Sequence, residues 1–134
     1  MTQVQHIGDV QGRVTRLPFS SAVVAGDYVY CSGEVGFAPG TTTLVDGGIE
    51  EQTRQALRNL GVALEAAGSS LANVIKTLVF ISDEAAFPGF NRAYASFFPD
   101  GRYPARSTLV SGFVAPGVLV EIECVALRTA SYER

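Results

Sequence analysis

One arginine stands in a context suited to binding a small acid. Arg106 lies in the run Pro104-Ala105-Arg106-Ser107, at the start of a β-rich segment and directly after a loop. A guanidinium is planar, stays charged at any working pH and binds a carboxylate through two parallel hydrogen bonds. Two interpretations follow. Arg106 either holds the carboxylate of a small organic acid or forms a structural ion pair with Glu121 or Glu123.

The two glutamates of the last β-rich segment are the second candidate for chemistry. Glu121 and Glu123 are two residues apart, so on a strand they share a face at a separation of about 7 Å. That spacing is compatible with the acid and base of an inverting glycosidase. The chain has no tryptophan to stack on a sugar ring and is short for a polysaccharide cleft, which argues against that activity.

Other catalytic arrangements lack the residues to build them. His6 is the only histidine and lies in residues 1–14, which we expect to be partly mobile, so a Ser-His-Asp or Cys-His mechanism has no base. Cys31 and Cys124 are interpreted as buried free thiols, and they match no metal-ligand spacing. No glycine-rich phosphate loop occurs. The sequence therefore predicts chemistry without a metal or a cofactor.

Composition limits the kind of protein that can carry these residues. With 134 residues, of which 47% are hydrophobic, we expect one domain over residues 1–134 that builds its own core. Ten basic against thirteen acidic residues give a net charge of -3, and Lys76 is the single lysine, so no phosphate-binding surface and no nucleic-acid partner are predicted. Without a leader-like or membrane-spanning apolar run, we expect a cytoplasmic protein with no membrane partner.

Two helices are predicted to position the candidate residues. From Ile49 onward, apolar residues recur at steps of four and three, with Glu50 and Glu51 in the first turn and Gly68 as a terminating glycine. A second helix is predicted after Ser82 and Asp83, which are good N-cap residues, and before Pro99. The buried faces are expected to be Thr53, Leu57, Leu60, Leu64 and Ala67 in the first helix and Phe87, Phe90, Tyr94 and Phe97 in the second.

Short β-rich runs surround these helices and complete an α+β pattern. The element order is strand, strand, helix, strand, helix, strand, strand, which lets both helices cover one face of a single sheet. In the last strand, one face carries Glu121 and Glu123 among apolar residues, so we expect the open face to mediate oligomerisation. The predicted strands are Ser20–Val24, Tyr28–Ser32, Asn73–Ile81, Ala105–Val110 and Val118–Leu127.

The order and spacing of several short motifs resemble those of the reactive intermediate deaminases, the Rid or YjgF family. The resemblance runs from about Leu17 to Leu127, nearly the whole chain. The motifs are Leu17-Pro18-Phe19-Ser20-Ser21, Ser32-Gly33, Ile49–Leu57 (IEEQTRQAL), Glu65-Ala66-Ala67-Gly68, Val74–Phe80, Asn91 with Tyr94 and Phe97-Phe98, Pro104-Ala105-Arg106-Ser107 and Val120-Glu121-Ile122-Glu123.

This resemblance implies a fold, an assembly and an activity. The fold is chorismate-mutase-like, with a six-stranded mixed sheet and two helices on one face, assembled as a homotrimer with clefts between subunits. The activity is hydrolysis of 2-imino or 2-enamino acids to 2-oxo acids and ammonia. Arg106 is implied to bind the substrate carboxylate and Glu121 to position the water. The other residues expected to line the site are Phe19, Ser32, Gly33, Asn91 and Ser107.

Two departures from the family pattern bear on function. Phe19 stands where tyrosine is common, and Glu34 stands in Ser32-Gly33-Glu34-Val35-Gly36 where the usual run is Ser-Gly-Gln-Ile-Pro. They keep a second hypothesis open, a non-catalytic trimer that binds small carboxylate metabolites through Arg106. A third hypothesis, ribonuclease or translation-inhibitor activity, is disfavoured by the negative net charge.

Overall fold

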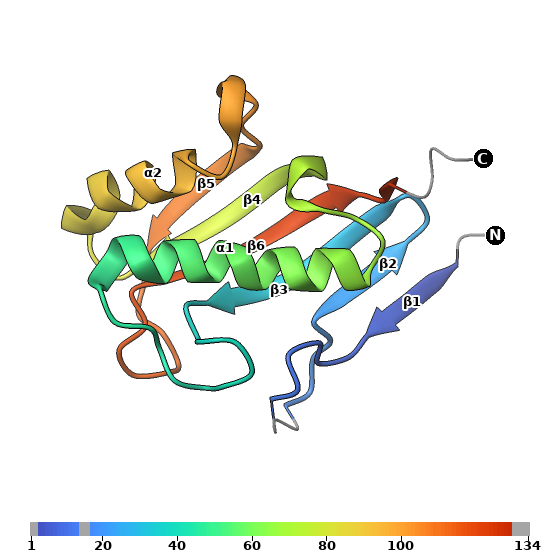
Figure 1. Cartoon of the computed structure of the whole chain (residues 1–134), viewed down its shortest axis with the longest axis horizontal. Coiled ribbons are helices and arrows are strands. Elements are labelled where there is room, and N and C mark those ends of the chain that lie inside the picture. The colour runs from blue at the N-terminus through green and yellow to red at the C-terminus, as the bar shows by residue number, and fades with distance from the viewer. Residues whose placement is uncertain (1–2, 14–16, 130–134) are drawn as a thin grey trace.

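The protein is a single six-stranded sheet with two helices packed against it (Figure 1). The computed structural model describes residues 3–13 and 17–129. The strand order is β1-β2-β3-β6-β4-β5, and only the β4–β5 pair is parallel, which makes the sheet mixed. The strands are β1 Val4–Ile7, β2 Ala22–Ala25, β3 Tyr28–Val35, β4 Val74–Ile81, β5 Ala105–Val110 and β6 Val120–Leu127.

Both helices lie on the same side of the sheet, with α2 over β4 and β5 and α1 over the centre (Figure 1). The predicted α+β architecture is thus confirmed. Helix α1 spans Gly48–Ala66 and α2 spans Phe87–Ala95. Three short 3-10 turns complete the described elements: η1 Leu71–Asn73, η2 Glu84–Ala86 and η3 Pro99–Gly101.

Helix α1 forms because its sequence supplies one continuous apolar face. Thr53, Leu57, Leu60 and Leu64 are all 0% exposed, as their spacing predicts. The helix ends at a left-handed Gly68, whose φ is +83°, and the backbone N–H of Ser69 donates to the carbonyl of Leu64 at 2.8 Å. This hydrogen-bonded glycine termination confirms the predicted helix end.

Strand β6 has the two different faces that its alternating sequence predicts. Val120, Ile122 and Ala126 are fully buried against the helices, and the free thiols Cys31 and Cys124 are register partners on that same buried face. The opposite face of the sheet is covered by neither helix and presents Tyr28 and Tyr30 of β3 as well as the glutamates of β6. Tyr28 is 43% exposed and Tyr30 is 48% exposed.

Three elements of the structure differ from those predicted from the sequence. The unpredicted edge strand β1 pairs with β2 and carries His6. The second helix is shorter than predicted, because Asp83 caps a 3-10 turn and α2 begins only at Phe87. Strand β6 begins at Val120 rather than two residues earlier, because the Gln52 side chain binds the backbone of Gly117 and Leu119.

Candidate functional site

Arg106 lies on the helix-covered face of edge strand β5, against the aromatic side of α2. Its Cζ atom is 4.9 Å from the ring centroid of Tyr94, 5.2 Å from that of Phe90 and 5.6 Å from that of Phe87. Such cation–π contacts favour a guanidinium over the ring faces. Among residues 3–13 and 17–129, no carboxylate lies within ion-pair distance of Arg106. Its charge is therefore free to meet that of a ligand.

A buried hydrogen bond fixes the aromatic support of Arg106. The hydroxyl groups of Tyr94 and Thr77 lie 2.8 Å apart, and Thr77 is the register partner of Arg106 across β4 and β5. Burial is the main cause that raises the pKa of Tyr94, so this phenol stays neutral. Of the aromatic residues of α2 predicted to form a buried face, Phe90 and Tyr94 are buried, whereas Phe87 is 40% exposed. All three contact the guanidinium and so help to orient the arginine.

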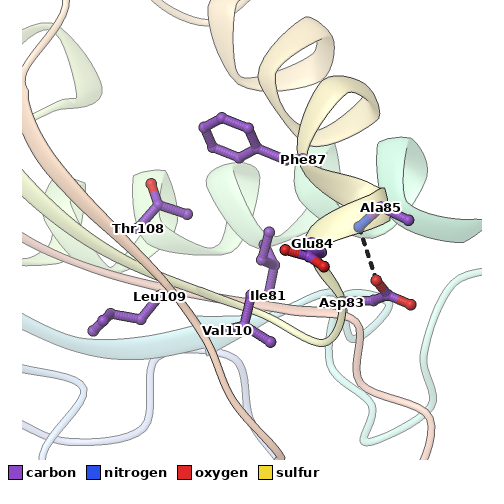
Figure 2. Close-up of a pocket in the computed structure, with 8 residues that line it drawn as sticks. All are labelled: Ile81, Asp83, Glu84, Ala85, Phe87, Thr108, Leu109 and Val110. Atoms are coloured by element: carbon purple, nitrogen blue, oxygen red, sulfur yellow. Dashed lines mark hydrogen bonds between the residues drawn. The ribbon is translucent and has the colours of Figure 1, made fainter.

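An open groove lies near this arginine, and Figure 2 shows the residues that line it. It has a volume of about 660 Å³, and Phe87 both lines it and contacts Arg106. Thr108, two residues after Arg106 and on the same strand face, also lines it, and its Oγ1 atom is buried without a hydrogen-bond partner. The groove is otherwise lined by Ile81, Asp83, Glu84, Ala85, Leu109 and Val110.

Glu121 lies on the open face of the sheet, directly over Gly33. A β-carbon added to Gly33 would lie 2.7 Å from Cδ of Glu121, so only glycine leaves room for this carboxyl group. Burial and, second, the negative charge of Glu123 raise the pKa of Glu121, which makes its carboxylate a stronger base. Local packing of β3 against β6 therefore positions the group expected to orient a water.

Glu121, Gly33 and Phe19 line a common cavity of about 510 Å³. The Phe19 side chain is 61% exposed there, so its ring forms part of an accessible surface. Ser32 lies at the edge of this region, but its Oγ donates to the carbonyl of Ser20 at 2.5 Å. Of the residues predicted for the site, the structure thus brings Phe19, Gly33 and Glu121 together, with Ser32 tying down the adjacent backbone.

The cavity also contains a largely buried carboxyl group and a largely buried guanidinium that we did not predict as site residues. Glu34 and Arg13 both line it, and Arg13 Nη1 is 3.8 Å from Oε1 of Glu34. Arg13 also donates to the carbonyl of Thr41 at 2.6 Å and lies over the ring of Phe37. The departure of Glu34 from the family motif was the only sequence signal of this pair, since nothing in the sequence places Arg13 beside β3.

The predicted ion pair between Arg106 and Glu121 or Glu123 is wrong. Arg106 lies on β5 and both glutamates lie on β6, and β4 separates these two strands in the sheet. Arg106 pairs with Thr77 and Glu121 pairs with Phe80, and residues three apart on β4 point to opposite faces of the sheet. One chain therefore cannot bring Arg106 and Glu121 to the same small substrate.

Ser107 and Asn91 complete the predicted set, in two separate places. Ser107 follows Arg106 on β5, so its side chain points to the open face, where Lys76 Nζ lies 3.5 Å from its Oγ. Asn91 is half-buried on α2, one residue after Phe90 and one turn after Phe87. Asn91 thus belongs to the helix that supports Arg106, whereas the Ser107 hydroxyl does not face the same space.

Comparison with known proteins places this geometry in a family. The model of the Endoribonuclease L-PSP family matches residues 12–128. The chain belongs to this family. L-PSP relatives of known name include the human 2-iminobutanoate/2-iminopropanoate deaminase, which is 38% identical over 111 residues, covering 83% of this chain and 80% of the relative. The mouse protein of the same name is 40% identical over 111 residues, covering 83% and 82%.

Solved structures of the L-PSP and Rid families share the whole fold. The crystal structure of yeast Mmf1 has a TM-score of 0.85 at 29% identity, covering 95% of this chain and 100% of that one. The crystal structure of RidA from Psychrobacter has a TM-score of 0.82 at 32% identity, covering 92% and 98%. The resemblance to the Rid family and the fold it implies are thus confirmed.

Within the described part of this L-PSP chain, neither helix is long and apolar enough to cross a membrane.

Proposed function

We propose that this protein hydrolyses 2-imino and 2-enamino acids to 2-oxo acids and ammonia, in clefts formed between subunits of a homotrimer. The observation that carries the proposal is the separation of two half-sites in one chain. Arg106 presents an unpaired guanidinium on the helix-covered face, and Glu121 presents a basic carboxylate on the open face. A second subunit that docks on the open face supplies the missing half.

The roles of the two half-sites follow from their chemistry. Arg106 binds the substrate carboxylate through two hydrogen bonds, because its guanidinium has no carboxylate partner in the described chain. Glu121 accepts a proton from a water that attacks the imine carbon. An imine carbon is already electrophilic, so orientation and proton transfer are the main requirements of the reaction. The relatives named as 2-iminobutanoate/2-iminopropanoate deaminases support this choice of substrate class.

A competition assay tests the activity. An amino-acid oxidase generates 2-iminobutanoate, semicarbazide traps it, and the protein is expected to reduce the amount of trapped product. Arg106→Ala is expected to lose this effect. Arg92→Ala is the matched control, because Arg92 also lies on α2, its side chain is 65% exposed, and among the described residues it pairs only with Glu50, at 3.4 Å. Equal loss in both variants would contradict a specific role for Arg106.

A measured molar mass tests the assembly on which the clefts depend. The open face carries Tyr28, Tyr30 and Leu109, each more than 40% exposed, and its burial between subunits would be favourable. Light scattering is expected to give the mass of three chains. A monomer at all concentrations would remove the second half of the site and refute the proposal.

A second candidate function is a non-catalytic trimer that binds small carboxylates. The observation that favours it is Phe19, which gives the cavity a ring without a hydroxyl at the position where tyrosine is common in the family. This function predicts that 2-oxobutanoate binds to the wild type and not to Arg106→Ala, while no imine is hydrolysed. Measured turnover of any 2-imino acid would exclude it.

A further inference from the structure

The cavity around Glu121 holds more carboxyl groups than nearby cations. Asp9, Glu34 and Glu121 line it, and Arg13 is the only cationic side chain among its described lining residues. Arg13 does not interact with these acids alone, because its Nε–H also donates a hydrogen bond to the Thr41 carbonyl. One guanidinium offsets the charge of one carboxylate at most, so full ionisation of all three acids is unfavourable in this enclosed space.

Glu34 is the acid that retains a proton in this cluster. Its side chain is 13% exposed, whereas Asp9 is exposed and Glu121 is only partly buried. Burial is the main cause that raises the pKa of Glu34 to about 7; Arg13 opposes it, and the nearby Asp9 and Glu121 add to it. Below about pH 7, Glu34 is therefore mostly protonated and carries an O–H donor in the cavity that Glu121 also lines.

We infer that Glu34 is the proton donor to the substrate nitrogen during deamination, with Glu121 as the base that activates water. This inference rests on the proposed function and adds a catalytic residue to it. It follows from the placement of two carboxyl groups, the more buried Glu34 and the less buried Glu121, on the wall of one cavity. Pairs of titratable groups whose environments separate their proton affinities are suited to act as acid and base together.

The proton transfers balance over two steps. In the first step, the water oxygen bonds to the imine carbon, Glu121 takes the water proton, and the C=N π electrons take the proton of Glu34. The product is a carbinolamine, with Glu34 ionised and Glu121 protonated. In the second step, the C–N bond breaks, its electron pair leaves with ammonia, and Glu121 returns its proton to that nitrogen. The carbinol O–H proton passes to Glu34 as the C=O bond forms, which restores both groups.

Glu34→Gln is the variant that tests this role. Glutamine keeps the shape of a protonated glutamate and its hydrogen-bond donor, but it has no proton to transfer near neutral pH. Glu65→Gln is the matched control, because Glu65 is an exposed glutamate of α1 that does not line the cavity. The assay follows 2-iminobutanoate hydrolysis over a pH series, with the uncatalysed rate subtracted at each pH.

The inference predicts a difference in both rate and pH profile. For the wild type and Glu65→Gln, kcat/KM should fall as the pH rises through about 7, because Glu34 loses the proton that it donates. For Glu34→Gln, this fall should disappear. Below neutral pH, its kcat/KM should be lower than the wild-type value by up to about 10²-fold. A Glu34→Gln protein with the wild-type rate and profile would overturn the role of Glu34 and leave the deaminase activity standing.

A spectroscopic measurement keeps the inference testable if Glu34→Gln does not fold. Carbon-13 NMR of wild-type protein with labelled glutamate carboxyl groups should show one resonance that titrates near neutral pH, assigned by its absence from Glu34→Asp. Titration of the Glu34 resonance in the ordinary glutamate range would overturn the inference. A wild type inactive on every imine would instead refute the proposed function itself.

Discussion

Replacement of Gly33 by alanine is expected to displace Glu121 without disturbing the fold. The added β-carbon would lie 2.7 Å from Cδ, 2.8 Å from Oε2 and 2.9 Å from Cγ of Glu121. Ordinary contact begins at 3.4 Å, so the carboxyl group has to retreat by about 0.7 Å. Gly33 is not among the residues with positive φ, so alanine adds no backbone strain. Because a misplacement of about 1 Å can reduce catalysis about 10²-fold, we expect kcat/KM to fall about 10-fold to 10²-fold.

The assay compares imine hydrolysis with binding of the product analogue. In Gly33→Ala, turnover of 2-iminobutanoate should fall while binding of 2-oxobutanoate through Arg106 persists. Gly8→Ala is the matched control, because a β-carbon at Gly8 meets no atom within 4 Å. Wild-type turnover by Gly33→Ala would refute the reasoning that Glu121 must occupy the space over Gly33. Thermal unfolding curves that match the wild type would show that lost turnover does not reflect unfolding.

Three further predictions concern stability. Leu57→Ala removes a fully buried side chain of α1 and should lower the free energy of unfolding by about 2–5 kcal/mol in urea denaturation, and a change below 1 would contradict its core position. Tyr94→Phe leaves the buried Thr77 hydroxyl unpaired and should cost about 1–3 kcal/mol by the same measurement, whereas a neutral effect would mean that the hydrogen bond contributes nothing. Folding raises the pKa of Glu34 from 4.5 to about 7, so the unfolded state loses its proton at lower pH than the folded state. As the pH rises across that interval, the free energy of unfolding of the wild type should therefore fall by about 3 kcal/mol relative to that of Glu34→Gln. A difference that does not depend on pH would contradict the burial of this acid.

Local sequence patterns predicted most of the helices and strands, because burial follows their periodicity. The spacing of Leu57, Leu60 and Leu64 marks the face of α1 that contacts the sheet, and the alternation along β6 marks its two faces. Strand β1 was missed because its pairing with β2 supplies hydrogen bonds that four exposed or half-buried residues do not encode locally. The number of residues that separate β1 from β2 in the sequence hides that pairing from any local pattern.

The site was predicted less completely because its geometry depends on strand order. The motif resemblance predicts Arg106 and Glu121 as site residues, but no periodicity indicates that β6 inserts between β3 and β4. The strand order puts β4 between the two residues, and the pairing register, Arg106 with Thr77 and Glu121 with Phe80, puts their side chains on opposite faces. Arg13 was missed for a related reason, since only the folded chain brings the segment before β2 against Glu34 at the end of β3.

The central claim is that each active site takes Arg106 from one subunit and Glu121 from another, and subunit mixing tests it most directly. Arg106→Ala and Glu121→Gln are each expected to be inactive on 2-iminobutanoate. When the two variants are unfolded together in equal amounts and refolded, each mixed trimer regains one intact site, so about a quarter of the wild-type activity should return. Mixed trimers that stay inactive, while wild type refolded in the same way recovers its activity, would contradict the shared site.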